Sequence, residues 1–394
     1  MKFVTLESLC SDIIDCPHST PKWLDEGIPV IRNFNLINGH IDTSNLSYVD
    51  EATYLERIKR ANPEEDDIII SREAPMGVVG MVPKGFKCCL GQRLVLLKVN
   101  RLKCSPQYLL YALLSDVVQK QINRIDLTGS IVSNLNIPDM KKLLIPIVDG
   151  DINKIGEYLN FIDENISNNN KIAQQLEAMT KTIYDYWFLQ FEFPNEEGKP
   201  YKSSGGKMVW NEELQRDIPE GCGSAKLKDV IVENPKSKIK VGDVKNIGEV
   251  PFFTSGAEIL STNDSIVSGL NCYLNTGGNA DVKYYYGEAS YSTDTWCITA
   301  EDGMKYILPF ILDKIKPSMD KVFFQGTGLR HLQKNLLREY SLCIPDNDVL
   351  KKFEKIARDI FVQQHNLLAE NRKLESLKEF LLPLLMNGQV TVGE

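Results

Sequence analysis

The sequence predicts an α+β protein in which two globular α/β domains are each followed by a long helix. Three observations predict this fold. A chain of 394 residues with 43% hydrophobic content can bury more than one core. In each half, short apolar runs bounded by turn residues are followed by helical periodicity. Matching motifs also recur between the halves in the same order, which indicates an internal repeat.

The first domain is predicted within residues 1–147. Its strand patterns occupy residues 66–73, 77–83 and 93–99, where aliphatic residues stand between turn residues. Residues 105–124, SPQYLLYALLSDVVQKQINR, have the apolar spacing of a helix.

The second domain is predicted within residues 222–347 and repeats this order. Its strand patterns occupy residues 250–256, 271–277, 281–287 and 296–301, and a helix pattern follows at 304–315. Between the halves, residues 191–221 are rich in Gly, Pro, Ser and charge, which is typical of a linker.

Two long helices complete the prediction, a central helix within 148–190 and a C-terminal helix within 348–390. In both, apolar residues recur at alternating spacings of three and four, which predicts a coiled-coil seam. The predicted seam contains Ile155, Leu159, Ile162, Ile166 and Leu176 in the first helix, and Phe353, Ile360, Leu367 and Leu374 in the second. Polar residues interrupt the apolar stripe of each helix, as they do in coiled coils where a polar seam residue fixes the register of pairing.

The two helices align with each other at a constant spacing. Leu176-Glu177 and Leu374-Glu375 are 198 residues apart, and the same offset places Ile155 on Phe353 and Ile162 on Ile360. If the helices pair antiparallel, the two domains are related by a pseudo-two-fold axis and separated by the coiled coil. The alternative is two unrelated amphipathic helices, each packed on its own domain.

Composition limits the function classes. The net charge is −8, and residues 1–150 contain 17 Lys/Arg against 18 Asp/Glu. The sequence therefore lacks the excess of basic residues that is typical of nucleic-acid-binding domains, and charge alone does not indicate such a role. Nine cysteines without a C-x-x-C pair, and four scattered histidines, predict reduced thiols and no metal site. No apolar run is long enough to span a membrane, so we expect a cytoplasmic protein.

Several motifs together identify a family. They are LEAMTKTIYDYWF at 176–188, FEFPNEEGKPYKSSGGKM at 191–208, IPEG at 218–221, DCPHST at 15–20 and SREAPMG at 71–77. With the order domain, Ile-Pro, helix, linker, domain, helix, the chain resembles the specificity subunit of type I restriction-modification enzymes over essentially its whole length. Cys222-Gly223 departs from the family pattern, which has a tryptophan after IPEG, and leaves the start of the second domain open.

The resemblance implies a non-catalytic DNA reader. Each domain would be a target recognition domain for one half of a bipartite duplex target, and the helices would set the spacer and dock two modification subunits. Those subunits would use S-adenosylmethionine to methylate adenine, and restriction subunits would use ATP and Mg²⁺. The chain itself is expected to hold no cofactor. In agreement, no N-P-P-[YF] or D-P-P-[YF] motif and no G-x-x-x-x-G-K-[ST] loop occurs in it.

Base edges and phosphates are contacted mainly by Arg, Lys, Asn, Gln, His and hydroxyl side chains on loops and element ends. By this criterion, the candidates in the first domain are His18, Ser19, Arg32, Asn33, Ser71, Arg72, Gln92, Arg93 and Ser130. The candidates in the second are Thr254, Ser255, Asn279, Ser292, Thr293, Gln325, Thr327, Arg330 and His331. The alternative for each is a turn residue or a buried hydrogen-bonding partner.

Two other function classes stay open at this stage. One is a coiled-coil scaffold or adaptor protein without DNA binding, and the other is a free-standing enzyme of unrecognised chemistry. Salt-dependent binding of duplex DNA would separate the DNA reader from the scaffold.

Overall fold

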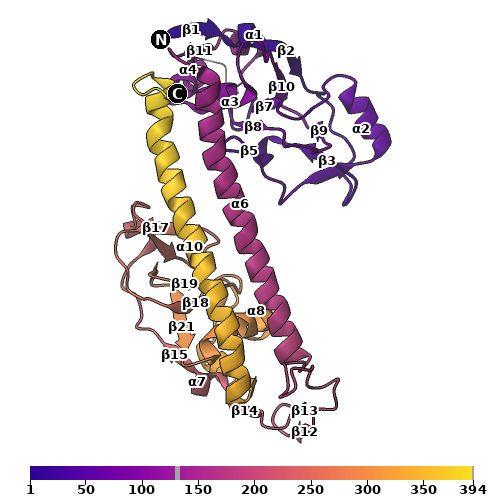
Figure 1. Ribbon diagram of the computed structural model, residues 1–394, viewed down its shortest axis with the longest axis vertical. Coiled ribbons are helices and arrows are strands. Elements are labelled where there is room, and N and C mark those ends of the chain that lie inside the picture. Colours follow the sequence, from indigo (N-terminus) through magenta and orange to yellow (C-terminus); the bar gives the residue numbers. More distant parts are fainter. Residues whose placement is uncertain (129–133, 393–394) are drawn as a thin grey trace. The chain divides into compact units, whose positions relative to one another are not determined.

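A computed structural model describes residues 1–128 and 134–392 of the chain. The chain forms two compact units. Unit 1 contains Met1–Ser167 with Lys373–Glu394, and unit 2 contains Asn168–Arg372. Each unit therefore combines one globular domain with a stretch of both long helices, which Figure 1 shows as α6 and α10.

Unit 1 is built on a four-stranded antiparallel sheet in the order β2 (Cys10–Asp15), β10 (Leu94–Val99), β7 (Ile68–Ser71) and β8 (Val79–Met81). The two central strands, IIIS and LVLLKV, are apolar almost throughout because both of their faces are buried. Helices α3 (Pro106–Leu114) and α4 (Asp116–Thr128) follow, where the sequence predicted one continuous helix. Ser115 separates them, and its hydroxyl donates to the carbonyl of Ala112 at 2.6 Å.

Smaller elements complete unit 1. A second sheet has the order β6 (Ser47–Val49), β3 (Ile28–Ile31), β9 (Cys89–Leu90), and β1 (Lys2–Thr5) pairs with β11 (Leu144–Ile147). The remaining elements are α1 (Leu6–Leu9), a short 3-10 turn (Asn33–Asn35), β4 (Leu36–Ile37), β5 (His40–Ile41), α2 (Glu51–Ile58) and α5 (Ile137–Lys141).

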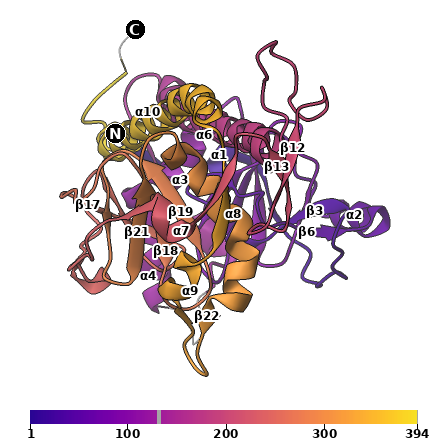
Figure 2. The ribbon, with the colours of Figure 1, turned by 90° about the horizontal axis from the view of Figure 1, so that it is seen from below.

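Unit 2 has the same plan. Its four-stranded sheet has the order β15 (Ile231–Glu233), β21 (Thr295–Ala300), β18 (Leu270–Asn275), β19 (Val282–Tyr286). Its second sheet has the order β17 (Ile259–Thr262), β16 (Val250–Phe253), β20 (Ser290–Tyr291). Helix α8 (Met304–Val322) packs on β18, β19 and β21, as Figure 2 shows.

The correspondence extends to the ends of unit 2. Strand β14 (Gly223–Lys226) pairs with β24 (Ser341–Ile344) as β1 pairs with β11, and α7 (Leu227–Val230) and α9 (Lys334–Arg338) match α1 and α5 in order. Strands β22 (Phe324–Gln325) and β23 (His331–Leu332) form a further hairpin, and Val241–Asp243 form a short 3-10 turn. The two units thus repeat one topology, which confirms the mixed α/β prediction.

Helix α6 spans Ile152–Tyr184 and continues as a π-helical turn to Leu189, while α10 spans Asn347–Met386. Within unit 2 they run antiparallel, since the Nδ2 of Asn169 donates to the Oδ1 of Asn371 at 3.0 Å and the ring centroids of Trp187 and Phe353 are 5.9 Å apart. The predicted seam residues near the helix N-termini, such as Ile155 and Phe353, belong to the cores of their own units. Ile166, Leu176, Leu367 and Leu374 are only half-buried.

The predicted linker, residues 191–221, contains regular structure. Strands β12 (Met208–Asn211) and β13 (Arg216–Pro219) form an antiparallel hairpin, and Phe193 stacks on Tyr201 with ring centroids 4.7 Å apart. Among the described residues, no helix is both long and apolar enough to cross a membrane.

Candidate nucleic-acid interface

The predicted DNA-contacting residues of unit 1 gather where β3 and β7 end and β10 begins. The backbone N–H of Gly91 donates to the carbonyl of Ile31 at 2.7 Å, and that of Arg72 donates to the carbonyl of Arg93 at 2.8 Å. These bonds bring three chain segments together. We call the surface formed by Arg32, Asn33, Arg72, Gln92 and Arg93 the unit-1 edge.

Arg72 is held inside the unit-1 edge by the fold. Its guanidinium lies 3.0 Å from Asp15 and also donates to the carbonyl of Leu135 at 3.2 Å and to Asn134 at 3.2 Å. Its side chain is only 14% exposed. Asp15 also pairs with His18 at 3.0 Å. Arg72 therefore supports the loops at this edge, and its charge is already neutralised.

The other two arginines of this edge have different surroundings. Arg93 has a left-handed backbone, with φ of 66°, and its 54% exposed side chain pairs with Glu73 at 3.2 Å. The guanidinium of Arg32 lies 5.1 Å from the ring of Trp23 and 4.7 Å from that of Phe34. Flanking rings restrict a guanidinium to few orientations, which suits recognition of a planar acceptor pair.

The amides of this edge tie its loops together. Asn33 donates to the carbonyl of Ala74 at 2.5 Å, and Gln92 donates to the carbonyl of His18. Among the residues that the structure describes, neither amide oxygen accepts a hydrogen bond, and both side chains are partly exposed.

The three predicted serines of unit 1 have different positions. Ser71 is fully buried; its hydroxyl donates to the carbonyl of Pro75 at 2.7 Å and accepts from the N–H of Val78 at 2.9 Å. It therefore belongs to the scaffold beneath the edge. Ser19 is exposed, and Ser130 lies outside the described residues.

Unit 2 has an equivalent surface on the same framework. The N–H of Ser292 donates to the carbonyl of Phe253 at 2.9 Å, and that of Thr276 donates to the carbonyl of Asp294 at 3.2 Å. The parallel pairings of β3 with β9 and of β16 with β20 have the same register. We call the surface formed by Thr254, Ser255, Thr276, Thr293 and Asp294 the unit-2 edge. These residues stand at the positions of Arg32, Asn33, Arg72, Gln92 and Arg93 in the same order.

Arg330, one of the sequence candidates in unit 2, is engaged within the fold. One nitrogen of its guanidinium lies 3.0 and 3.1 Å from the two carboxylate oxygens of Asp320 and 3.0 Å from the amide oxygen of Asn279. It thus corresponds in role to Arg72, a loop support with a neutralised charge. The neighbouring candidates Gln325, Thr327 and His331 are exposed.

The hydroxyl residues of unit 2 are mostly structural. Ser292 is fully buried and shares a hydrogen bond of 2.9 Å with Thr295, and Thr254, 6% exposed, donates to the carbonyl of Glu258 at 3.1 Å. Ser255 donates to the carbonyl of Asp294, and Thr293 is half-buried. The side chains differ between the two edges, while the backbone arrangement is shared.

Thr276 and Asp294, which the structure places on the unit-2 edge, were not among the residues selected from the sequence. Asp294 was not selected because the selection was limited to basic, amide and hydroxyl side chains. The repeat found in the sequence, with its offset of 198, does not align Arg93 with Asp294. Their equivalence follows from the structure, in which β10 begins at Leu94 and β21 at Thr295, an offset of 201.

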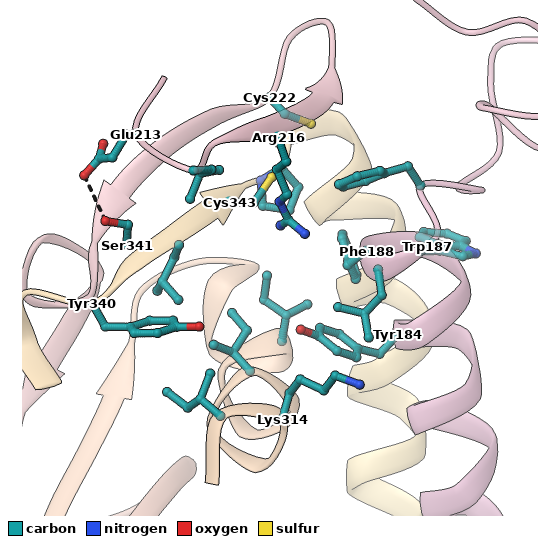
Figure 3. Close-up of a pocket in the computed structure, with 18 of the residues that line it drawn as sticks. Tyr184, Trp187, Phe188, Glu213, Arg216, Cys222, Lys314, Tyr340, Ser341 and Cys343 are labelled. Carbon is teal, nitrogen blue, oxygen red and sulfur yellow. Dashed lines mark hydrogen bonds between the residues drawn. The ribbon is translucent and has the colours of Figure 1, made fainter. Parts of the chain in front are cut away.

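A separate cavity of about 690 Å³ lies in unit 2 between the end of α6 and the β12–β13 hairpin (Figure 3). Tyr184, Trp187 and Phe188 form its aromatic wall, and Glu213 accepts from Ser341 at 3.1 Å on the opposite side. Its lining also contains Arg216 and the thiols of Cys222 and Cys343. Across the described residues, no group of His, Cys, Asp and Glu is arranged to hold a metal ion.

Comparison with known proteins shows similarity in sequence and in fold. Residues 2–178 match the family model described as the type I restriction modification DNA specificity domain. The MjaIX specificity subunit of a type I restriction enzyme of Methanocaldococcus jannaschii is 24% identical over 83% of this chain and 78% of its own length. The putative MjaX specificity subunit of the same organism is 25% identical over 93% of this chain and 88% of its own length.

The fold has a solved counterpart. The crystal structure of a type I restriction-modification S subunit from M. genitalium superposes with a TM-score of 0.61, covering 97% of this chain and 95% of that one at 16% identity. At this identity the likeness establishes the fold.

Proposed function

We propose that this chain is a specificity subunit of a type I restriction-modification system and that its two edges read the two halves of a bipartite DNA target. The unit-1 edge would contact one half-site and the unit-2 edge the other. The chain itself would be non-catalytic, and two modification subunits docked on it would methylate adenine.

The main support for this proposal is that the two edges share a backbone hydrogen-bonding framework but carry different side chains on it. The hydrogen bond from Leu135 N–H to the carbonyl of Arg72 recurs as that from Leu332 to Thr276, both at 3.0 Å. The side chains on this framework nevertheless change from arginines and amides to hydroxyls and one carboxylate. A duplicated reader that recognises two different base sequences requires this combination.

An exchange of the first domain tests the proposal. Residues 1–147 are replaced by the first domain of another specificity subunit, and the chain is expressed with its modification subunits. N6-methyladenine is then mapped across the cellular DNA. We expect one half of the methylated motif to change and the other half to persist. A change in both halves would contradict independent reading by the two units.

We also propose that α6 and α10 set the spacer between the half-sites. Four residues inserted in α6 between Ser167 and Asn168, together with four in α10 between Arg372 and Lys373, add about 6 Å of helix. We expect the spacer to lengthen by about 2 base pairs at ~3.4 Å each. A chain with both insertions that methylates the original spacer would contradict this role.

The remaining partners follow from the same proposal. Restriction subunits would join through the modification subunits, with S-adenosylmethionine, ATP and Mg²⁺ bound on those partners. If the chain is instead a coiled-coil scaffold, its complex will bind duplex DNA without sequence preference or not at all. Competition between specific and random duplexes over a range of salt concentrations distinguishes these outcomes.

A further inference from the structure

A pocket of about 380 Å³ opens beside the unit-2 edge. Thr276, Thr293 and Asp294 line it from the edge, and Lys236, His331 and Lys334 line it from neighbouring segments. It thus combines two cations with two carboxylates, Glu233, which pairs with Arg338 at 2.7 Å, and Asp294, which stands at the position that Arg93 holds in unit 1.

The backbone of Asp294 is fixed by three hydrogen bonds to its carbonyl oxygen. The N–H of Thr276 donates at 3.2 Å, the hydroxyl of Thr276 at 2.7 Å, and the hydroxyl of Ser255 donates as well. Among the described residues, no hydrogen bond or ion pair occupies the exposed carboxylate. The side chain therefore extends from a backbone held in place by hydrogen bonds, and its acceptor oxygens are available.

The positive charges of the two lysines offset the repulsion between the Asp294 carboxylate and the phosphates of DNA. Within the described part of the chain, neither Lys236 nor Lys334 pairs with a carboxylate, and Lys334 lies 5.0 Å from the ring of Trp296. Burial lowers the pKa of Lys334, and the nearby Arg338 and Lys236 lower it further, although Glu233 opposes them. An anion beside Lys334 would relieve this repulsion, and a backbone phosphate is the anion that duplex DNA offers.

We propose that Asp294 determines specificity in the unit-2 half-site by accepting a hydrogen bond from an exocyclic amino group, the N4 of cytosine or the N6 of adenine. Lys236 and Lys334 hold the flanking phosphate and so place the base edge. A carboxylate has only acceptors when ionised, so it rejects the O6 of guanine and the O4 of thymine. This inference rests on the proposed function.

The test is selection from a randomised duplex pool by the full chain in complex with its modification subunits. We expect the wild-type complex to select a bipartite site that offers an amino group at one position of one half-site. Asp294→Ala should lower the preference at that position by roughly tenfold or more and leave the other positions unchanged. Asp294→Asn, which keeps the size and adds a donor, should admit a carbonyl-bearing base there.

Matched controls separate a reading role from a structural one. Glu288→Gln removes an exposed carboxylate at the opposite end of the same sheet and should leave every preference unchanged. Lys334→Ala should weaken binding to all sequences and reduce the salt slope by about one.

Two results would overturn the inference in distinguishable ways. If the wild-type complex selects a bipartite site and Asp294→Ala retains every preference within about twofold, Asp294 does not read a base, and the proposed function stands. If the wild-type complex selects no sequence, the proposed function fails and this inference fails with it.

Discussion

The two units attach their domains to the long helices in different ways. In unit 1, Asp163 of α6 is 5% exposed, lies 2.6 Å from Lys378 of α10 and accepts from the hydroxyl of Tyr111 at 2.7 Å. The 198-residue spacing places Phe361 at the position of Asp163, and Phe361 packs edge-on against Tyr284 with ring centroids 5.9 Å apart.

This difference shows that one framework accepts either a buried ion pair or an aromatic cluster at the same place. An ion pair is favourable there only because each charge has its partner, while a cluster depends on close packing. Unit 1 should therefore be sensitive to the loss of one charge and to pH, and unit 2 to changes in side-chain volume.

The largest effect is expected from Asp163→Ala. The substitution leaves the ammonium of Lys378, 16% exposed, and the buried hydroxyl of Tyr111 without their acceptor, which should lower the free energy of unfolding by about 3 kcal/mol. Urea unfolding followed by circular dichroism measures this loss. The double variant Asp163→Leu with Lys378→Met removes both charges and should recover part of the loss, because the buried hydroxyl of Tyr111 still lacks its acceptor. A double variant as unstable as the single one would contradict this explanation.

The pH dependence of Asp163 offers a second comparison. Burial raises the pKa of this carboxyl, but hydrogen bonding to His40 and the charge of Lys378 outweigh burial and leave the pKa below its ordinary value. The contribution of the ionised Asp163 carboxyl to the free energy of unfolding is therefore complete above the unfolded-state pKa of about 4, and it is lost as the pH falls through the folded-state pKa. The stability difference between wild type and Asp163→Asn should shrink between pH 6 and pH 3. A constant difference would mean that the carboxyl is not held ionised.

Asn371→Ala addresses the helix pair in unit 2 and should have an intermediate effect. Asn371 is 5% exposed, accepts from Asn169 at 3.0 Å and donates to Asn170 at 2.8 Å. Its removal leaves two polar partners partly unsatisfied, which should cost about 1–2 kcal/mol in urea unfolding. Asn170→Ala removes an exposed partner and should cost less. Equal losses would show that burial of Asn371 is unimportant.

Phe361→Leu should lower the free energy of unfolding by roughly 1 kcal/mol, because the replacement keeps apolar contact but loses ring packing. The loss should be the same from pH 6 to pH 3, unlike that of Asp163→Asn. A loss that varies with pH would contradict the assignment of an apolar contact.

The smallest effect concerns chemical reactivity rather than stability. A hydrogen bond from Cys343 lowers the pKa of Cys222 to about 7, whereas burial raises that of Cys88 to about 12. At pH 7.5, iodoacetamide should therefore alkylate Cys222 well before Cys88, as peptide mass spectrometry can measure. Cys343→Ser should slow alkylation of Cys222, and an unchanged rate would exclude the hydrogen bond as the cause.

The long helices and the most apolar strands were predicted from the sequence. Apolar residues at alternating spacings of three and four located α6 and α10, and continuous apolar runs located β7 and β10. Short strands such as β1 were missed because their register depends on pairing with β11, some 140 residues away. Pairing over such a separation leaves no local pattern.

For the candidate site, the sequence determined which segments carry hydrogen-bonding side chains and that they occur twice. Only the tertiary structure decided which of these side chains are free. Arg72 is neutralised by Asp15 and Arg330 by Asp320, and the hydroxyl of Ser71 is buried, while the carboxylate of Asp294 stays exposed. The reason is physical: local periodicity reports which face of an element is apolar, but the partner of a charge is chosen by the distance between atoms that only the folded chain brings together.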